Sequence, residues 1–158
     1  MEKNSGFTIM EILIVLAVIA VLMAVAIPRF RGLQMEAWRS KAQGDLVTLK
    51  AAIESYKMNN AGYPVETPGA GKTISTGWQA ALTAAKPAMI SNALNDPFSG
   101  GGSTPYRYVL SADDANKANF YLVWSVGPDG STSITGIDDT SGAVTGAAGD
   151  DLIETNGK

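Results

Sequence analysis

Residues 6–11 read GFTIME and lead directly into an apolar run, ILIVLAVIAVLMAVAI, that ends at Ile27. From Phe7 the run is roughly 20 residues long, and a helix of that length, at about 1.5 Å per residue, covers the ~30 Å hydrocarbon core of a bilayer. Glu11 is the exception, because a carboxylate at the bilayer centre costs on the order of 2–3 kcal/mol, and less near the interface. The stretch therefore predicts a membrane-spanning helix in which Glu11 has a function and needs a partner.

Two simpler interpretations explain less of this segment. A secretory signal peptide has a basic leader, a short apolar core and a cleavage site after that core. Here the leader MEKNS carries one basic residue, Lys3, and the apolar run is long. A plain single-span anchor explains the length of the run but gives no reason for Glu11 or for the pair Gly6-Phe7.

The order Gly6, Phe7, Glu11 and an apolar run ending at Pro28 resembles the N-terminus of type IV pilins and pseudopilins. The resemblance implies that a prepilin peptidase cuts between Gly6 and Phe7 and methylates the new amine of Phe7. It also implies that Glu11 meets the Phe7 amine of a neighbouring subunit in a helical filament. A wrongly registered neighbour would leave the acid unpaired in a low dielectric, so Glu11 would set the register between subunits. Glu11 and Pro28 are then the candidate assembly residues.

Composition limits the remaining function classes. The 158 residues suffice for one anchor helix and one small domain, and the net charge of −3 argues against nucleic acid as a required partner. The sequence has no cysteine and no histidine, so it lacks disulfides, thiolate metal sites and the commonest general base. No spacing of the remaining polar side chains singles out a catalytic group. The sequence therefore predicts a protein that is not an enzyme.

The helical pattern continues beyond Pro28, although a proline removes one backbone hydrogen bond and kinks a helix. Apolar residues recur mostly at three- and four-residue steps as far as Tyr56, with Lys41 as the polar exception on that stripe. Residues 59–62, Asn-Asn-Ala-Gly, tolerate a left-handed cap and end the pattern. We expect one helix of about 50 residues, with its first part in lipid and its second part packed on a domain.

The expected organisation is a leader at 1–6, a membrane-spanning segment at 7–28, an amphipathic half of the same helix at 29–60, and a globular domain at 61–158. This domain should begin with an exposed variable loop and contain a short helix at 78–85. Strands are expected at 106–110 and 120–126, with a weaker third strand between Thr132 and Ile137. We predict an α+β fold, in which a small antiparallel sheet packs on the apolar stripe of the long helix, as in type IV pilins.

Motifs in the domain resemble the major pseudopilin of type II secretion. They are YP at 63–64, DPF at 96–98, PYRY at 105–108, SVGPDG at 125–130 and the paired acids at 150–151. The chain departs from that pattern in Phe98, where Trp is usual, in a longer stretch from 130 to 149, and in a tail without a closing aromatic residue.

The resemblance implies a subunit of the periplasmic pseudopilus, a homo-oligomeric filament. It places the chain in the bacterial inner membrane as a single-pass protein with its C-terminal domain in the periplasm. Its partners would be a prepilin peptidase, an inner-membrane platform protein, an assembly ATPase and minor pseudopilins or pilins. Two alternatives stay open: a type IV pilus subunit at the cell surface that serves adhesion, motility or DNA uptake, and a membrane-anchored binding module that does not assemble.

The acid-rich tail is the one candidate metal site. Its segment is rich in Gly, Ser, Thr and Ala and contains Asp129, Asp138, Asp139, Asp150 and Asp151. Carboxylates and free loop carbonyls are the ligands that Ca²⁺ takes. The spacing is not that of an EF-hand loop, and composition alone favours a solvated acidic loop.

The resemblance implies more, because the major pseudopilins bind calcium in this terminal loop. Carried over to this chain, the side-chain ligands are Asp129, Asp150 and Asp151, and carbonyls near Ser125 or Val126 are plausible additions. Nothing is carried onto the two aspartates of the lengthened stretch. The Ca²⁺ ion would be structural, because it would hold a glycine-rich tail that has little apolar content of its own.

Overall fold

The computed structural model describes residues 7–67 and 69–157, and of Pro28 only the backbone. Helix α1 (Ile9–Asn60) runs through Pro28 without a break, which confirms the prediction of one long helix. It ends where expected, and the residue that adopts the left-handed conformation there is Ala61, with φ of 60°. The predicted leader lies outside the described residues.

The chain forms two compact units, of which the first ends at Ala37 and the second begins at Trp38. The first unit is built on the beginning of α1. The second contains the remainder of α1, the short helix α2 (Gln79–Ala84) and the 3₁₀ turn η1 (Gly100–Gly102). It also contains five strands: β1 (Arg107–Leu110), β2 (Tyr121–Ser125), β3 (Ser133–Ile137), β4 (Val144–Ala147) and β5 (Leu152–Thr155).

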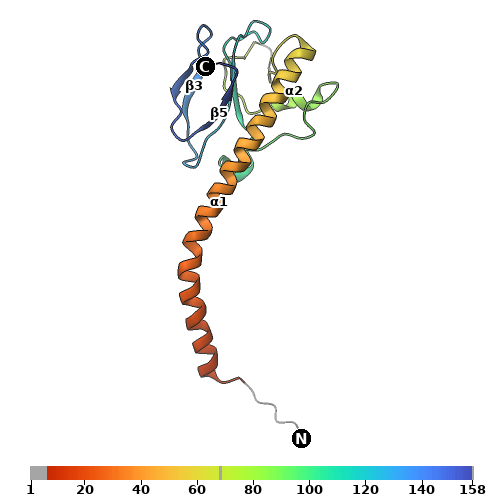
Figure 1. Cartoon of the computed structure of the whole chain (residues 1–158). Helices are drawn as coiled ribbons and strands as arrows, with labels where there is room; N and C mark the ends of the chain where they lie inside the picture. Colours follow the sequence, from red (N-terminus) through yellow and green to blue (C-terminus); the bar gives the residue numbers. More distant parts are fainter. Residues whose placement is uncertain (1–6, 68, 158) are drawn as a thin grey trace. The chain divides into compact units, whose positions relative to one another are not determined.

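The strands form two antiparallel sheets (Figure 1). One has the order β1-β2-β5, with Tyr108 opposite Val123 and Trp124 opposite Ile153. The other is the hairpin β3-β4. The α+β class and the strands β1 and β2 are as predicted. The expected third strand exists as β3, but it pairs with β4, and the third strand of the main sheet is β5.

The burial of β2 explains why the expected third strand does not extend the main sheet. Every residue of β2 is buried, so both faces of this strand must be covered. Because side chains alternate between the faces of a strand, Tyr121 and Val123 join the core that α1 completes, whereas Leu122 and Trp124 point the other way. On that second face they pack with Val109 of β1 and with Ile134 and Ile137 of β3. The hairpin is therefore the cover of the face that α1 does not reach.

Candidate functional site

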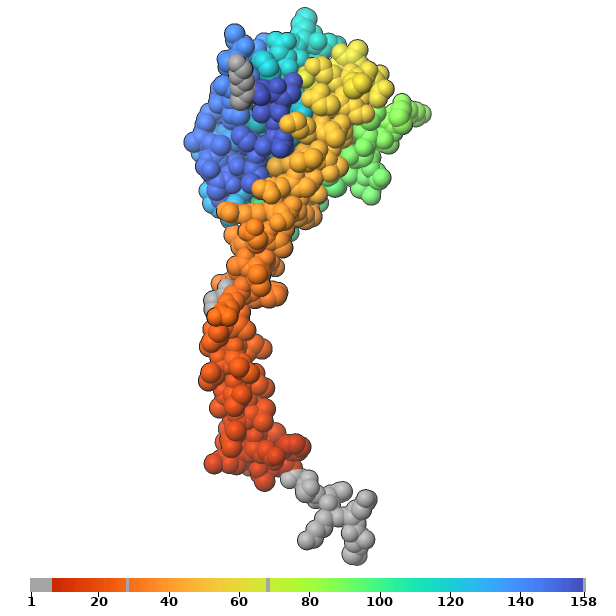
Figure 2. All heavy atoms as spheres, viewed as in Figure 1, coloured from red at the N-terminus to blue at the C-terminus, as the bar shows by residue number. Residues whose placement is uncertain are grey.

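The beginning of α1 exposes apolar side chains on all sides. Phe7, Ile9 and Val21 are 78%, 83% and 68% exposed, and Figure 2 shows this segment in red. A helix that is apolar all round suits a lipid environment or the interior of an assembly. Among the described residues, α1 is the helix that is long and apolar enough to cross a membrane. The segment therefore has the length and composition of a membrane anchor.

Glu11 lies in the first turn of α1. Its backbone N–H donates to the hydroxyl oxygen of Thr8 at 3.2 Å, and Thr-x-x-Glu is the spacing of a capping box. A carboxylate at a helix N-terminus is also favoured by the helix dipole. Thr8 thus caps the helix through the backbone of Glu11, and the helix dipole gives a local reason for the carboxylate, neither of which the sequence reasoning named. The other predicted N-terminal residue, Gly6, lies outside the described residues.

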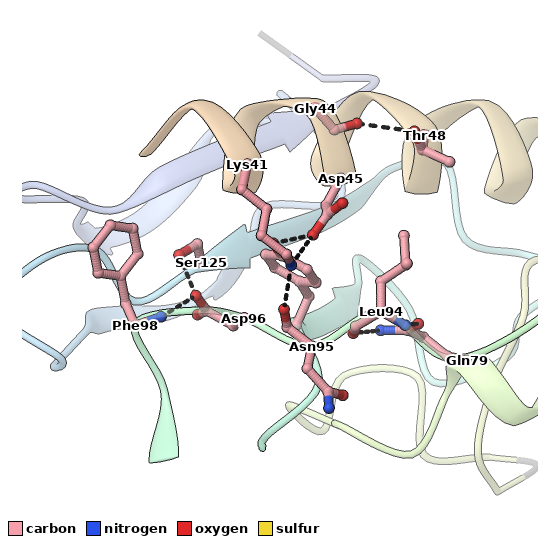
Figure 3. A network of polar contacts seen from close by, with 11 residues as sticks. Lys41, Gly44, Asp45, Thr48, Gln79, Leu94, Asn95, Asp96, Phe98 and Ser125 are labelled. Atoms are coloured by element: carbon pink, nitrogen blue, oxygen red, sulfur yellow. Dashed lines mark hydrogen bonds and ion pairs between the residues drawn. The ribbon is translucent and has the colours of Figure 1, made fainter. Parts of the chain in front are cut away.

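Lys41, which interrupts the apolar stripe of α1, belongs to a polar network (Figure 3). Its Nζ lies 2.7 Å from Oδ2 of Asp45 and donates to the carbonyl of Asn95 at 3.3 Å. Asp45 also accepts a hydrogen bond of 2.9 Å from the hydroxyl of Tyr106. Burial, together with the carboxylate of Asp45, raises the pKa of Tyr106 above its ordinary value. The network joins α1 to the segment that precedes β1.

Asp96 is a buried carboxylate beside this network (Figure 3), and it is only 1% exposed. Its Oδ1 accepts hydrogen bonds from the backbone N–H of Phe98 at 3.0 Å and from the hydroxyl of Ser125 at 2.7 Å. Its Oδ2 accepts one from the backbone N–H of Val126 at 2.9 Å. Hydrogen bonds to a charged acceptor are about twice as strong as neutral ones. Asp96 therefore fixes the end of β2. The segments 126–132 and 148–151, which carry Asp129, Asp150 and Asp151 and flank the hairpin β3-β4, are called the acidic loop below.

The acidic loop turns at Gly127, whose φ of +69° suits glycine. An ideal Cβ there would lie 2.5 Å from the carbonyl oxygen of Asp150. Two residues later, the backbone N–H of Asp129 donates to Oδ2 of Asp150 at 3.2 Å. The structure therefore brings Asp129 and Asp150 together, although 21 residues separate them along the chain.

Asp151 is held by a different residue. Its Oδ2 accepts a hydrogen bond of 2.6 Å from the hydroxyl of Thr132, whereas its Oδ1 is buried and has no hydrogen-bond partner among the residues that the structure describes. Burial raises the pKa of Asp151, and the negative charges of Asp150 and Asp129 raise it further, while the bond from Thr132 lowers it. The unpartnered oxygen is unusual, because buried polar atoms in folded proteins nearly always have a partner.

The other two aspartates of the tail, Asp138 and Asp139, accept hydrogen bonds from other residues. Asp138 accepts hydrogen bonds from the N–H groups of Thr140 and Ser141 and from the Ser141 hydroxyl, and these bonds lower its pKa. Asp139 accepts a hydrogen bond of 2.6 Å from the buried Ser111. Both therefore fix the turn between β3 and β4.

The carboxylates do not form a ready-made cluster. Within residues 7–67 and 69–157, no three His, Cys, Asp or Glu side chains are grouped so that they could hold a metal ion. What the loop offers instead is an oxygen-only donor set: the carboxylate of Asp150, which accepts from the backbone N–H of Asp129, the carboxylate of Asp129 itself, and one buried carboxylate oxygen of Asp151. This chemistry fits calcium, whose shell combines carboxylate oxygens with carbonyls and water.

Sequence reasoning named the three aspartates as candidate ligands but gave no such role to Asp96 or Thr132, which position the loop that carries them. For Asp96 the signal was the Asp-Pro dipeptide, which is typical of a turn that the aspartate itself caps. For Thr132 the local sequence, Ser-Thr-Ser, gives no signal, because its three hydrogen-bond partners come from β2, β3 and the residue before β5.

Comparison with known proteins gives two family matches. The model of type II secretion system (T2SS), protein G, matches residues 29–142, and that of the prokaryotic N-terminal methylation motif matches residues 1–27. A comparison with solved structures gives no match.

Curated relatives agree with these matches. The type II secretion system core protein G of Escherichia coli (strain K12) is 31% identical over 131 residues, which are 82% of this chain and 85% of that protein. The protein of the same name from Pseudomonas aeruginosa is 28% identical over 82% of this chain and 87% of its own. For the one from Klebsiella pneumoniae, 35% identity covers 48% of this chain, and the match spans about half of that relative, 54% of its length. The chain belongs to the protein G family of type II secretion systems.

Proposed function

We propose that this chain is the major pseudopilin of a type II secretion system, which polymerises into the periplasmic pseudopilus that drives protein export. The observation that carries the proposal is the beginning of α1, whose apolar side chains are exposed around the whole helix. Such a helix needs lipid before assembly and neighbouring helices after it. Membership of the protein G family supports the same conclusion and makes the chain a structural subunit, not an enzyme.

Processing at the N-terminus follows from the same proposal. A prepilin peptidase would cut between Gly6 and Phe7 and methylate the Phe7 amine, and the match to the N-terminal methylation motif supports this step. The new amine would meet Glu11 of a neighbouring subunit. The chain would span the inner membrane once, with its domain in the periplasm. An inner-membrane platform protein, an assembly ATPase and minor pseudopilins would be its assembly partners.

A structural calcium ion forms the second part of the proposal. Asp129, Asp150 and Asp151 would supply carboxylate oxygens, with carbonyl oxygens near Ser125 or Val126 completing the shell. Support comes from the hydrogen bond between the first two of these aspartates and from the unpartnered, buried Oδ1 of Asp151. A buried carboxylate oxygen without a partner is costly, so a cation at this one oxygen would remove the cost.

The experiment that tests the main proposal is a clean in-frame deletion, scored in parallel for exoprotein secretion and for surface pili with twitching motility. We expect secretion to be lost, pili to be unchanged, and a plasmid copy to restore export. Loss of pili with intact secretion would show a pilus subunit instead, and an unchanged strain in both assays would favour an anchored module that does not assemble.

A further inference from the structure

Thr132 lies at the point where the acidic loop, the hairpin β3-β4 and the main sheet meet. We propose that Thr132 is a positioning residue for the cation site: its hydroxyl takes up one carboxylate oxygen of Asp151 and thereby directs the other oxygen toward the ion. This inference rests on the calcium part of the proposed function, and it assigns a role to a residue outside the proposed ligand set.

The Thr132 hydroxyl uses its one donor hydrogen and both of its acceptor lone pairs in hydrogen bonds. It accepts hydrogen bonds from Nε1–H of Trp124 and from the backbone N–H of Ile134, both at 3.2 Å. It donates its own hydrogen to Oδ2 of Asp151 at 2.6 Å. A threonine hydroxyl has one hydrogen to donate and two lone pairs. With both lone pairs occupied by donors, the hydrogen can point only toward the carboxylate.

The two donors are themselves fixed. Trp124 is fully buried in β2, and its indole packs between the main sheet and the hairpin. Ile134 belongs to β3 and is 3% exposed. The position of the Thr132 hydroxyl is therefore set by the docking of the hairpin on the sheet and not by the loop alone.

The fixed position of the Thr132 hydroxyl determines how the carboxylate of Asp151 is held. Its Oδ2 accepts the hydrogen bond from Thr132, and its Oδ1 is buried without a hydrogen-bond partner within residues 7–67 and 69–157. Asp150 and Asp129 lie close enough for their negative charges to act on this carboxylate, and the positive charge of Arg107 offsets them in part, so two anionic groups and one cationic group surround Asp151. The ligand class that satisfies a desolvated carboxylate oxygen in such surroundings is a hard divalent cation. Thr132 would then act like the residues that hydrogen-bond to a metal ligand and fix the orientation of that ligand.

The test uses the purified full chain in detergent and titration with CaCl₂ by calorimetry, after EDTA treatment and dialysis. Thr132→Val keeps the shape of the side chain and removes the hydroxyl, and Thr132→Ser keeps the hydroxyl. The matched control is Thr135→Val, because Thr135 is an exposed residue of the same hairpin whose hydroxyl bonds only to that of Thr145 at 3.3 Å.

We expect Thr132→Val to weaken calcium binding on the order of 10- to 100-fold, the usual effect of removing an outer-shell partner. Thr132→Ser should restore it nearly to the parent level, and Thr135→Val should leave it unchanged. Trp124→Phe, which removes one donor to Thr132 without touching the loop, should weaken binding less and in the same direction, and it serves as the test if Thr132→Val does not fold.

Two results would overturn the inference, and they are distinguishable. If the parent binds calcium and Thr132→Val or Trp124→Phe binds it equally well, Thr132 positions nothing. If the parent itself binds no calcium, the cation part of the proposed function fails and this inference fails with it. The deletion experiment would still decide whether the chain is a pseudopilin.

Discussion

At Gly127 the backbone passes so close to Asp150 that any side chain would collide with it. Gly149 provides a matched control, because it also has a positive φ, of +56°, but an added Cβ would meet nothing within 4 Å. We expect Gly149→Ala to lower the free energy of unfolding by roughly 1–2 kcal/mol, the cost of a left-handed residue. Gly127→Ala should lower it by about 2–5 kcal/mol, because overpacking adds to that strain. Equal losses in chemical denaturation would contradict the close approach.

Asp151 gives a second prediction, on the effect of calcium. In EDTA the isosteric Asp151→Asn should melt at or slightly above the parent temperature, because the variant removes a partly buried charge that Asp150 and Asp129 repel. In calcium at about 100 times its Kd, the parent should gain about 2.7 kcal/mol of stability. The variant should gain little. If calcium shifts the thermal unfolding of neither protein, the proposed site does not exist.

At the level of the elements, Asp96 links the segment before η1 to the end of β2. Asp96→Ala would leave the N–H groups of Phe98 and Val126 buried without an acceptor, so we expect a loss of about 3 kcal/mol or more in the free energy of unfolding. Asp138→Ala is the control, since Asp138 also accepts three hydrogen bonds but is exposed, and its donors can turn to water. Its loss should stay within about 1 kcal/mol. Similar losses for both variants would argue against a structural role for burial at Asp96.

The elements that could be predicted are those with a strong local pattern. α1 follows from a run of apolar residues and then a helical stripe, and β2 follows from seven consecutive residues with high strand propensity. β4 was missed because Val144–Ala147 is short and contains Gly146. β5 was missed because Leu152–Thr155 follows directly on two aspartates and contains Glu154. Its pairing with β2 spans about 30 residues of chain, and local propensity does not encode such a partner.

The residues of the candidate site also fall into those that could be predicted from the sequence and those that could not. Asp129, Asp150 and Asp151 could be named because residue types and a family resemblance point to them. Thr132 could not, since a threonine acquires such a role only when tertiary packing places it beside particular donors. Asp96 stood in the DPF motif, but its bonds to Ser125 and Val126 depend on tertiary packing that the local sequence does not encode. The sequence showed Lys41 as the polar exception on the apolar stripe of α1. Its partner Asn95 could not be predicted, because it lies 54 residues away along the chain.

At the scale of the whole molecule, we propose that the chain works as a polymerised subunit whose Glu11 carboxylate pairs with a neighbour. The capping box with Thr8 offers a purely local reason for the same residue. Glu11→Gln separates the two, because glutamine also suits the third position of a capping box but carries no charge. Thr8→Ala is the complementary variant, since it removes the cap and keeps the charge.

The most direct measurement is exoprotein secretion by a deletion strain that carries each of these variants, at equal membrane levels of the processed protein. If assembly needs the negative charge of Glu11, Glu11→Gln should abolish both secretion and filament formation. The strain with Thr8→Ala should secrete nearly as well as the parent. Secretion at the parent level by Glu11→Gln would contradict the account, because the carboxylate would then not be needed for assembly.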